Sequence, residues 1–157
     1  MELTELPFPF PGQIYRSAMP YGAYDPDGEL IPAYKKNDIS LIVILSSDEE
    51  IERLTGRDLQ SIYKLEGFEI LYFPIPDFST PEAGEFRVVV EQVLTRSKSG
   101  KGTAIHCHAG LGRSGMFVAC LAKLGMDYSS DEAIHWVRKI IPGAVEVPDQ
   151  EQLVRSF

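Results

Sequence analysis

Apolar residues occur along the chain in short runs, and polar residues, glycines and prolines separate these runs. The strongest run spans residues 39–45 (ISLIVIL) and is apolar on both faces, which predicts a central strand of a sheet. Residues 68–74 (FEILYFP) predict another strand, and shorter runs at 14–20 and 103–105 predict two more. A loop bounded by Pro76 and Pro81 follows the strand at 68–74.

The segments between these strands favour helices. Residues 82–97 predict a long amphipathic helix, whose apolar side carries Phe86, Val89, Val90, Val93 and Leu94. Shorter helices are predicted at 31–37, 49–54, 58–66, 131–141 and 149–157, and a buried apolar helix at 116–122. Strands that alternate with helices predict an α/β fold, a three-layer sandwich in which helices flank a mainly parallel central sheet.

The remaining segments are expected to be loops. Residues 1–12 contain three prolines and are expected to form an extended N-terminal arm without regular structure. Residues 21–32 are rich in glycine and proline, and we interpret Tyr21 and Tyr24 there as packing residues rather than substrate contacts. The chain has no repeat or interdomain linker, so residues 1–157 are expected to form a single domain.

Residues 106–115 (HCHAGLGRSG) connect the strand at 103–105 to the apolar helix at 116–122. A glycine-rich turn in that position leaves backbone amides unpaired at a helix N-terminus, where an anion binds. Gly110 and Gly112 allow the loop to curl until successive amides converge. We therefore predict an anion-binding nest formed by His108, Ala109, Gly110, Leu111, Gly112 and Arg113.

Cys107 lies at the mouth of this predicted nest. The loop amides, the helix dipole and Arg113 all favour the thiolate form of the cysteine. Arg113 follows Cys107 by six residues, and its planar guanidinium suits two oxygens of a phosphoryl group. A nucleophilic sulfur, an oxyanion cradle and a bidentate clamp in one loop indicate phosphoryl transfer to cysteine.

This stretch resembles the Cys-X5-Arg-Ser/Thr signature loop of the protein tyrosine phosphatase superfamily, in its small, dual-specificity-like branch. Residues 107–114 match the pattern position by position, and His106 matches the histidine that usually precedes the cysteine. Residues 11–18 (PGQIYRSA) are similar to the N-terminal segment that packs beside the active site in this branch. The resemblance implies a phosphatase domain, a phosphocysteine intermediate and no metal or other cofactor.

Phosphoryl transfer also needs an acid that protonates the leaving oxygen. Asp77 is the candidate, because it lies in the proline-bounded loop thirty residues before Cys107, where the resemblance places the acid aspartate. A turn-forming role for Asp77 is the alternative, and Asp25 and Asp27 are weaker rivals for the acid.

Several other residues have two interpretations. Ser114 is expected to donate a hydrogen bond to the cysteine sulfur, to cap the helix, or both. His106 is expected to bond to backbone and orient Cys107 rather than act as a base, and the role of His108 is open. Gln150 matches the family glutamine that helps to place the hydrolytic water, with a helix-start role as an equal alternative. The carboxylates at 48–50 are interpreted as a helix start, capped by Ser47 or Asp48, with bracing of Arg113 as the less favoured alternative.

Two nucleotide-binding motifs that resemble this loop are rejected. Residues 110–115 spell G-x-G-x-x-G, but a dinucleotide site needs an acidic residue at the end of the next strand, and Asp131 instead starts a predicted helix. The lysine of a nucleotide-binding P-loop is absent. Cys120 is interpreted as a core residue, with a regulatory disulfide to Cys107 as the alternative.

Composition limits the partners, metal sites and cellular location that we expect. The net charge of −8 argues against nucleic-acid and membrane partners. Two cysteines form no disulfide framework, and three scattered histidines without a CxxC motif provide no zinc spacing. No apolar run reaches the ~18 residues of a membrane span, and the acidic N-terminus is not a signal peptide. We therefore expect a cytoplasmic, monomeric protein.

The sequence as a whole predicts a metal-independent protein phosphatase that acts on phosphotyrosine, with phosphoserine and phosphothreonine also open. A phosphoinositide or inositol phosphatase is the first alternative, although residues 108–112 contain no lysine to bind several phosphates. The second alternative is an inactive phosphate-binding module, against which the intact Cys107, Arg113 and Asp77 argue.

Overall fold

The strands form one sheet in the computed structural model, which describes residues 3–157. In spatial order they are β1 (Thr4–Leu6), β2 (Ile14–Ser17), β5 (Gly102–His106), β3 (Ile39–Ile44) and β4 (Glu69–Tyr72). β2, β5, β3 and β4 run parallel, and β1 pairs antiparallel with β2. The prediction of a mainly parallel sheet is therefore confirmed.

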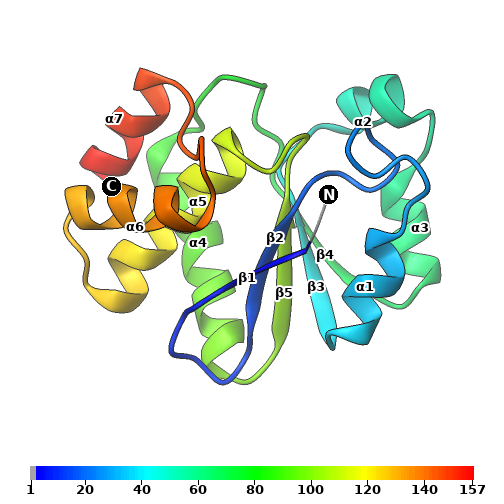
Figure 1. The fold of residues 1–157 in the computed structure, drawn as a ribbon, viewed down its shortest axis with the longest axis horizontal. Coiled ribbons are helices and arrows are strands. Elements are labelled where there is room, and N and C mark those ends of the chain that lie inside the picture. The colour runs from blue at the N-terminus through cyan, green and yellow to red at the C-terminus, as the bar shows by residue number, and fades with distance from the viewer. Residues whose placement is uncertain (1–2) are drawn as a thin grey trace.

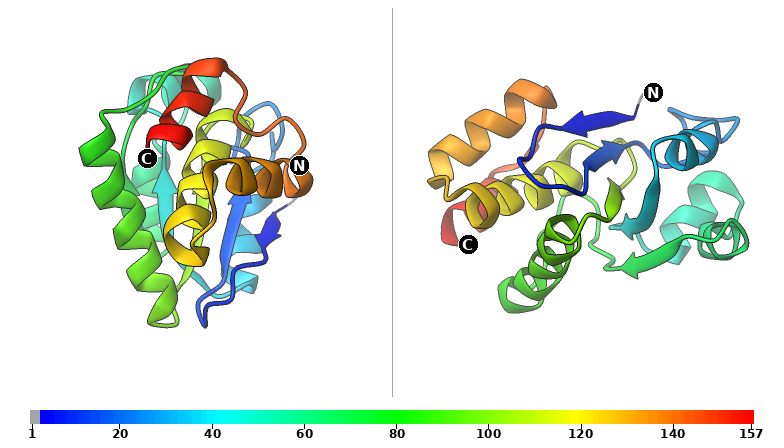
Figure 2. Two further views of the ribbon diagram at one scale, coloured as in Figure 1. Left: turned by 90° about the vertical axis from the view of Figure 1, so that its left-hand side faces the viewer. Right: turned by 90° about the horizontal axis from the view of Figure 1, so that it is seen from below.

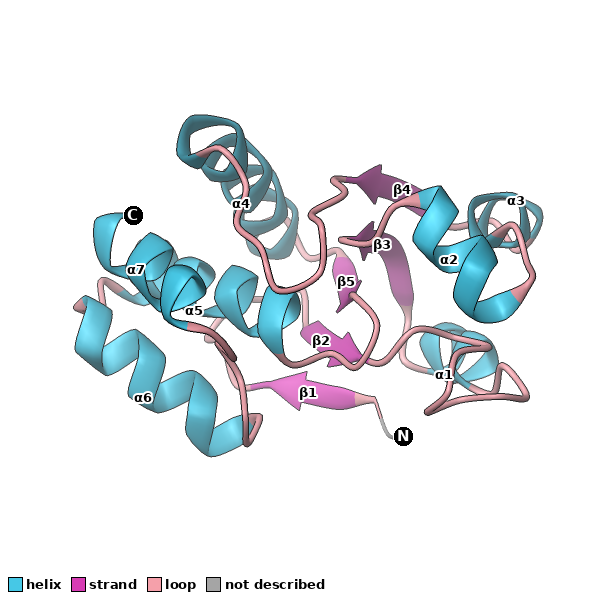
Figure 3. Cartoon of the chain, turned by 90° about the horizontal axis from the view of Figure 1, so that it is seen from above, coloured by secondary structure: helices cyan, strands magenta, loops and turns pink. Residues whose placement is uncertain are grey.

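Helices cover both faces of this sheet, as Figures 1 and 3 show. One face is covered by α1 (Leu30–Lys36), α2 (Asp48–Thr55) and α3 (Leu59–Leu65), and the other by α4 (Ala83–Lys98), α5 (Gly112–Met126), α6 (Ser130–Ile140) and α7 (Pro148–Ser156). The left panel of Figure 2 shows the second group in front of the sheet. These are the three layers that the sequence predicts.

The alternation of side chains along β3 explains why its sequence is apolar except at the half-buried Ser40. Leu41 and Val43 belong to the core between the sheet and α4–α7, whereas Ile42 and Ile44 belong to the core on the α1–α3 face. Both faces are buried from residue 41 onward, which favours apolar residues on both. The middle position in the sheet belongs to β5, however, and β3 lies beside it.

The N-terminal arm contains regular structure that the sequence interpretation missed. Residues 4–6 form β1, where Leu6 pairs with Ile14 and is almost fully buried. The prolines at 7, 9 and 11 all follow this strand, and an edge strand needs hydrogen bonds on one side only. The expectation of an irregular arm is wrong for residues 4–6, and residues 1–2 lie outside the described part.

The helix after the signature loop starts earlier than predicted. α5 begins at Gly112, and Arg113 and Ser114 lie in its first turn. A side chain at Gly115 would place its Cβ only 2.7 Å from the Cβ of Ala144, so glycine is required there by close packing against the α6–α7 connection. The local sequence of residues 112–115, with its two glycines, is typical of a loop. The packing against residue 144 that favours a helix here involves a distant segment, so the local sequence does not predict it.

The parallel strands bring their carboxyl ends to one edge of the sheet. β5 leads there into Cys107, β3 into α2, β4 into the loop that carries Asp77, and β2 into residues 18–20. Ligand sites of α/β folds gather at this edge.

Candidate active site

The loop between β5 and α5 is fixed to its neighbours from two sides. The amide of Met19 donates to the His108 carbonyl at 2.9 Å, and the amide of Leu45 donates to the His106 carbonyl at 3.0 Å. Gly110 has a φ of +81°, and a Cβ there would lie 2.5 Å from the carbonyl oxygen of Ser17. Only glycine fits this curl.

The curled loop leaves backbone amides without acceptors among the described residues, so they are available to a ligand. Within residues 3–157, the backbone amides of Ala109, Gly110 and Leu111 donate to no backbone carbonyl. Leu111 immediately precedes α5, so the first amides of that helix add to the same group. Free amides in a curled loop at a helix N-terminus have the geometry of an anion nest, and anion binding by this loop stays a prediction.

Cys107 lies in a cavity of about 170 Å³ at this nest. The cysteine is 3% exposed, and the hydroxyl of Ser114 donates to its sulfur at 3.1 Å. The residues that line the cavity are Tyr24, Asp77, Phe78, Cys107, His108, Ala109, Leu111, Arg113 and Glu146. The cavity thus brings Cys107, Arg113 and Asp77 together from separate segments of the chain.

Arg113 is buried and held by Glu50, the third residue of α2. Its Nη1 and Nη2 donate to the two carboxylate oxygens of Glu50, each at 2.8 Å, and Nη1 also donates to the carbonyl of Ile75 at 2.8 Å. Burial alone lowers the pKa of Arg113, but the hydrogen bonds to Glu50 and the negative charges of Cys107, Glu50 and Asp77 raise it above its ordinary value. The guanidinium therefore stays charged.

This pairing specifies which edge of the Arg113 guanidinium is open. Glu50 occupies the edge formed by the two terminal nitrogens, and binding of two phosphoryl oxygens by Arg113 stays a prediction. The buried Nε has no partner among the described residues, and Nη2 lies 3.3 Å from Oδ1 of Asp77. The Nε–Nη2 edge is the part left for an oxyanion. Both interpretations of the carboxylates at 48–50 therefore hold. Glu50 braces Arg113, which was the less favoured one. The same residue lies at the helix start, where the hydroxyl of Ser47 accepts its amide.

Asp77 lies on the loop between β4 and α4, with its side chain 43% exposed. Its Oδ1 accepts the amide of Phe78 at 3.0 Å, and Phe78 adopts a left-handed φ of +57°. The carboxylate is thus close to Arg113 and also accessible to a leaving group. The rival Asp25 is buried and caps α1 by accepting the amides of Glu29 and Leu30, and neither Asp25 nor Asp27 lines the cavity.

His106 is fully buried behind the cysteine. Its Nδ1 bonds to the carbonyl of Cys107 at 3.2 Å, and because a carbonyl only accepts, Nδ1 carries the ring proton. Nε2 then accepts the hydroxyl of Tyr63 at 2.8 Å. Burial lowers the pKa of His106 to about 4. The expected backbone hydrogen bond is present, and the ring is neutral at physiological pH.

His108 and Tyr24 form one wall of the cavity. Their ring centroids are 5.7 Å apart, and Tyr24 is 47% exposed. The packing interpretation holds for Tyr21, which contacts the core and carries the guanidinium of Arg57 over its ring at 4.0 Å. Tyr24 packs against His108 and also lines the cavity, so its role as a packing residue rather than a substrate contact stays a prediction.

Gln150 is buried at the start of α7, and its Oε1 accepts the amides of Glu146 at 2.9 Å and Val147 at 3.4 Å. This is the helix-start contact. Its Nε2 is buried without a hydrogen-bond partner in the described part of the chain, and a Cβ on Gly112 would lie 3.1 Å from it. Gln150 therefore lies beside the first residue of α5, although it does not line the cavity itself.

Three residues near the cavity were not singled out by the sequence analysis. Phe78 and Glu146 line it, and they come from loops whose position depends on the whole fold. Arg16 of β2 is almost fully buried, and its Nη1 would lie 2.9 Å from a Cβ on Gly110. Burial lowers the pKa of Arg16, and the negative charge of Cys107 opposes this shift. The position of an arginine within a predicted strand is the sequence signal that could have identified this buried cation.

Residues 3–157 contain no group of three or more His, Cys, Asp or Glu side chains placed to hold a metal ion. None of the helices formed by these residues is long and apolar enough to cross a membrane.

Comparison with solved structures places the fold among phosphatases. A crystal structure of Tk-PTP in its active form is 30% identical, with a TM-score of 0.79, and the match covers 92% of this chain and 90% of that one. Kinase associated phosphatase with its catalytic-site cysteine replaced by serine is 23% identical, with a TM-score of 0.89 over 100% of this chain and 93% of that one.

Comparison of sequences agrees. Cyclin-dependent kinase inhibitor 3 of Rattus norvegicus is 30% identical over 125 residues, which are 78% of this chain and 59% of that protein. The chain thus spans less than two thirds of this curated relative. Residues 21–126, which include Asp77, Cys107 and Arg113, match the family described as "Polymorphic toxin system, DSP-PTPase phosphatase". The chain belongs to the dual-specificity branch of the protein tyrosine phosphatase family.

Proposed function

We propose that this chain is a protein phosphatase that hydrolyses phosphotyrosine through a phosphocysteine intermediate. One observation carries the proposal: Cys107 lies in a cavity with an unpaired amide nest, and the guanidinium of Arg113 lines the same cavity while Glu50 holds it. Family membership supports phosphatase activity independently.

In the first step the thiolate of Cys107 attacks phosphorus, an S–P bond forms and the P–O ester bond breaks. The loop amides and the Nε–Nη2 edge of Arg113 stabilise the phosphoryl oxygens as negative charge develops on them. Asp77 gives its proton to the leaving oxygen, which departs as the alcohol or phenol.

In the second step water attacks phosphorus and the S–P bond breaks. Asp77, now a carboxylate, takes the proton from this water. The hydroxyl of Ser114 stabilises the departing thiolate through the hydrogen bond it already makes at 3.1 Å. We assign placement of the water to the free Nε2 of Gln150, beside Gly112.

Two aromatic side chains support phosphotyrosine as the substrate. Tyr24 and Phe78 line the cavity and are 47% and 59% exposed, so an aryl ring that follows its phosphate inward meets apolar surface on entering. A phosphoinositide finds less support, because residues 108–112 contain no lysine and the cavity adds the carboxylate of Glu146.

The test is a substrate panel assayed in the presence of a chelator: phosphotyrosine, phosphoserine and phosphothreonine peptides, and a phosphoinositide. We expect the phosphotyrosine peptide to have the highest kcat/KM. Cys107→Ser should abolish turnover on all substrates but retain phosphopeptide binding, because the amide nest remains. A phosphoinositide as the best substrate would contradict the assignment to protein substrates. Turnover by Cys107→Ser would contradict the mechanism.

A further inference from the structure

Two hollows meet at the mouth of the candidate site. The cavity above Cys107 and an adjoining groove of about 510 Å³ share Phe78, Leu111 and Glu146. The groove continues along residues 143–147, the connection between α6 and α7, to Arg138. A peptide whose phosphorylated residue enters the cavity therefore has a groove for its neighbouring residues. An extended chain advances about 3.3–3.6 Å per residue, so residues one or two positions away lie near the shared edge.

The free charge at this shared edge is negative. Glu146 is exposed, and within residues 3–157 its carboxylate forms no ion pair and accepts no hydrogen bond. Arg138 at the other side of the groove is engaged, because its Nε and Nη2 donate to the carbonyls of Ala144 and Val145, both at 3.0 Å. Its charge is paired with Glu151 at 3.4 Å. Asp77, the other acidic residue of the cavity, lies 3.3 Å from Nη2 of Arg113, so Glu146 carries the free charge, and the chain has a net charge of −8.

We infer that Glu146 determines specificity by favouring substrates with a lysine or arginine within two residues of the phosphorylated residue. The inference rests on the proposed function, since it concerns the surroundings of a phosphopeptide. The nest and Arg113 take the phosphate, and Glu146 pairs with a cationic side chain that lies over the shared edge. The same carboxylate repels an acidic residue or a second phosphate at those positions, which would face it without a counter-charge.

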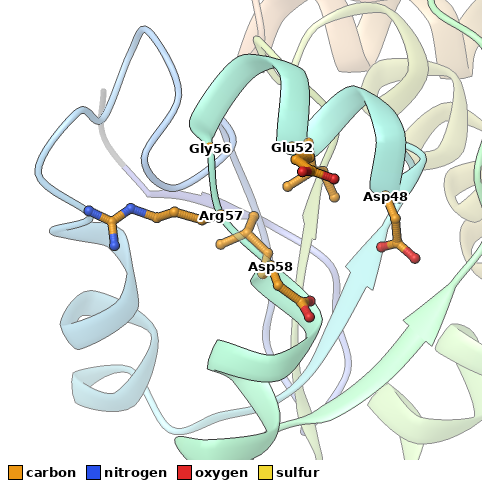
Figure 4. Close-up of a pocket in the computed structure, with 7 residues that line it drawn as sticks. Asp48, Glu52, Gly56, Arg57 and Asp58 are labelled. Atoms are coloured by element: carbon orange, nitrogen blue, oxygen red, sulfur yellow. The ribbon is translucent and has the colours of Figure 1, made fainter.

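A second acidic hollow provides the rival location. A cleft of about 390 Å³ lies between α2 and α3. Its exposed charged side chains, drawn in Figure 4, are Asp48, Glu52, Asp58 and Arg57. Two of these carboxylates already have partners: Asp48 accepts from Nε2 of Gln60 at 2.9 Å, and Asp58 accepts from the amide and hydroxyl of Ser61. No residue of the signature loop lines this cleft. Glu52, exposed on α2, is therefore a matched control for a change of charge.

The experiment compares Glu146→Gln and Glu146→Lys with Glu52→Gln and Glu52→Lys. Each enzyme hydrolyses phosphotyrosine peptides that carry lysine, norleucine or glutamate at one position between −2 and +2. Within each enzyme the measured quantity is the ratio of kcat/KM for the lysine peptide to that for the norleucine peptide, so a general loss of activity cancels. Thermal unfolding of all four variants checks that they are folded.

For the wild type we expect the lysine peptide to be preferred by about two- to five-fold at the best position, the effect of one exposed ion pair. Glu146→Gln should reduce this ratio to about one, and Glu146→Lys should reverse it in favour of the glutamate peptide. High salt should weaken the wild-type preference, because exposed charges are screened. Both Glu52 variants should keep the wild-type ratio.

Three outcomes would overturn the inference. They are a wild type that hydrolyses the peptides without preferring lysine, a preference that survives in both Glu146 variants, and a preference that is lost in the Glu52 variants instead. In each of these cases the proposed function stands. A wild-type enzyme that hydrolyses no phosphopeptide contradicts the proposed function itself, and the assignment of Glu146 falls with it.

Discussion

Glu50 and Arg113 meet in the two-point geometry in which both oxygens of a carboxylate face both terminal nitrogens of a guanidinium. The pairs Oε1–Nη1 and Oε2–Nη2 are each 2.8 Å apart, and the Arg113 side chain is 1% exposed. This pairing fixes the rotation of the guanidinium. It leaves Nε and the second hydrogen of Nη2 for a phosphoryl group.

The first prediction concerns this orientation. Glu50→Gln keeps the size of the side chain but replaces one acceptor oxygen with a donor group, so Arg113 loses its two-point support. We expect kcat/KM on phosphotyrosine peptide to fall by about 10²-fold, the usual cost of a small misplacement in an active site. Glu49→Gln, the preceding and exposed residue of the same helix turn, should change kcat/KM little. Equal effects of the two variants would show that Glu50 does not position Arg113.

The second prediction concerns Asp77 and the leaving group. A proton donor matters most when the departing oxygen is strongly basic. Asp77→Asn should therefore cost roughly 10²–10⁴-fold on phosphotyrosine, the usual contribution of general acid–base catalysis. The loss should shrink as the leaving group becomes less basic. The measurement is kcat against leaving-group pKa for both enzymes, and parallel lines would assign the acid to another residue.

The third prediction separates the two cysteines. Burial raises the pKa of Cys120 to about 12, so its thiolate is scarcely populated at pH 8. Cys107 lines a cavity instead. Iodoacetamide should therefore modify one cysteine in the folded protein and both in denaturant, and inorganic phosphate should slow the first modification. Mass spectrometry of the labelled peptides identifies the site. Label on Cys120 in the folded protein would contradict the prediction, as would a peroxide-induced disulfide between the two cysteines.

The fourth prediction is a pH dependence of stability. The pKa of His106 in the folded protein is about 4, below its ordinary value near 6.5. Between these pH values the unfolded chain binds a proton that the folded protein does not, so stability falls as the pH falls from 6.5 to 4. The loss that His106 contributes over this range is on the order of 3 kcal/mol.

Denaturant unfolding of wild type and His106→Asn between pH 4 and 7 measures this contribution. The difference in unfolding free energy between the two proteins should shrink as the pH is lowered. His135→Asn, which replaces an exposed histidine, should not change the slope in the same way. If the slopes of wild type and His106→Asn agree, the ring is not buried in its neutral form.

The signature loop was predictable because its parts are neighbours in the chain. Cys107, Arg113 and Ser114 are brought together by local curling, and the observed contact of Ser114 with the sulfur follows from that curl. The alternation of strands and helices was also predictable. The apolar run of β3, for example, indicates a strand that is buried on both faces, as the structure shows.

The features that the sequence did not predict depend on contacts between segments that are distant in the chain. Nothing local distinguishes Glu50 from Asp48 and Glu49, since all three suit a helix start. Only the orientation of α2 relative to α5 selects the residue that reaches Arg113. Tyr24 and Glu146 likewise lie in loops whose place is set by the sheet and by α5. The three residues of β1 carry too little pattern to be recognised without their partner strand.

The pairing of β2 with β5 has a kinetic consequence. Ile14 is aligned with Thr103 in this parallel pair, so most of the chain must be synthesised and ordered before the strand that leads into Cys107 gains its second neighbour. Such non-local pairing forms slowly and late, because a long loop has to close first. During refolding from denaturant, helical signal should return early, while the ability to bind phosphate should return only with the final cooperative phase. The surroundings of Cys107 would then form last, and no early intermediate would bind phosphate.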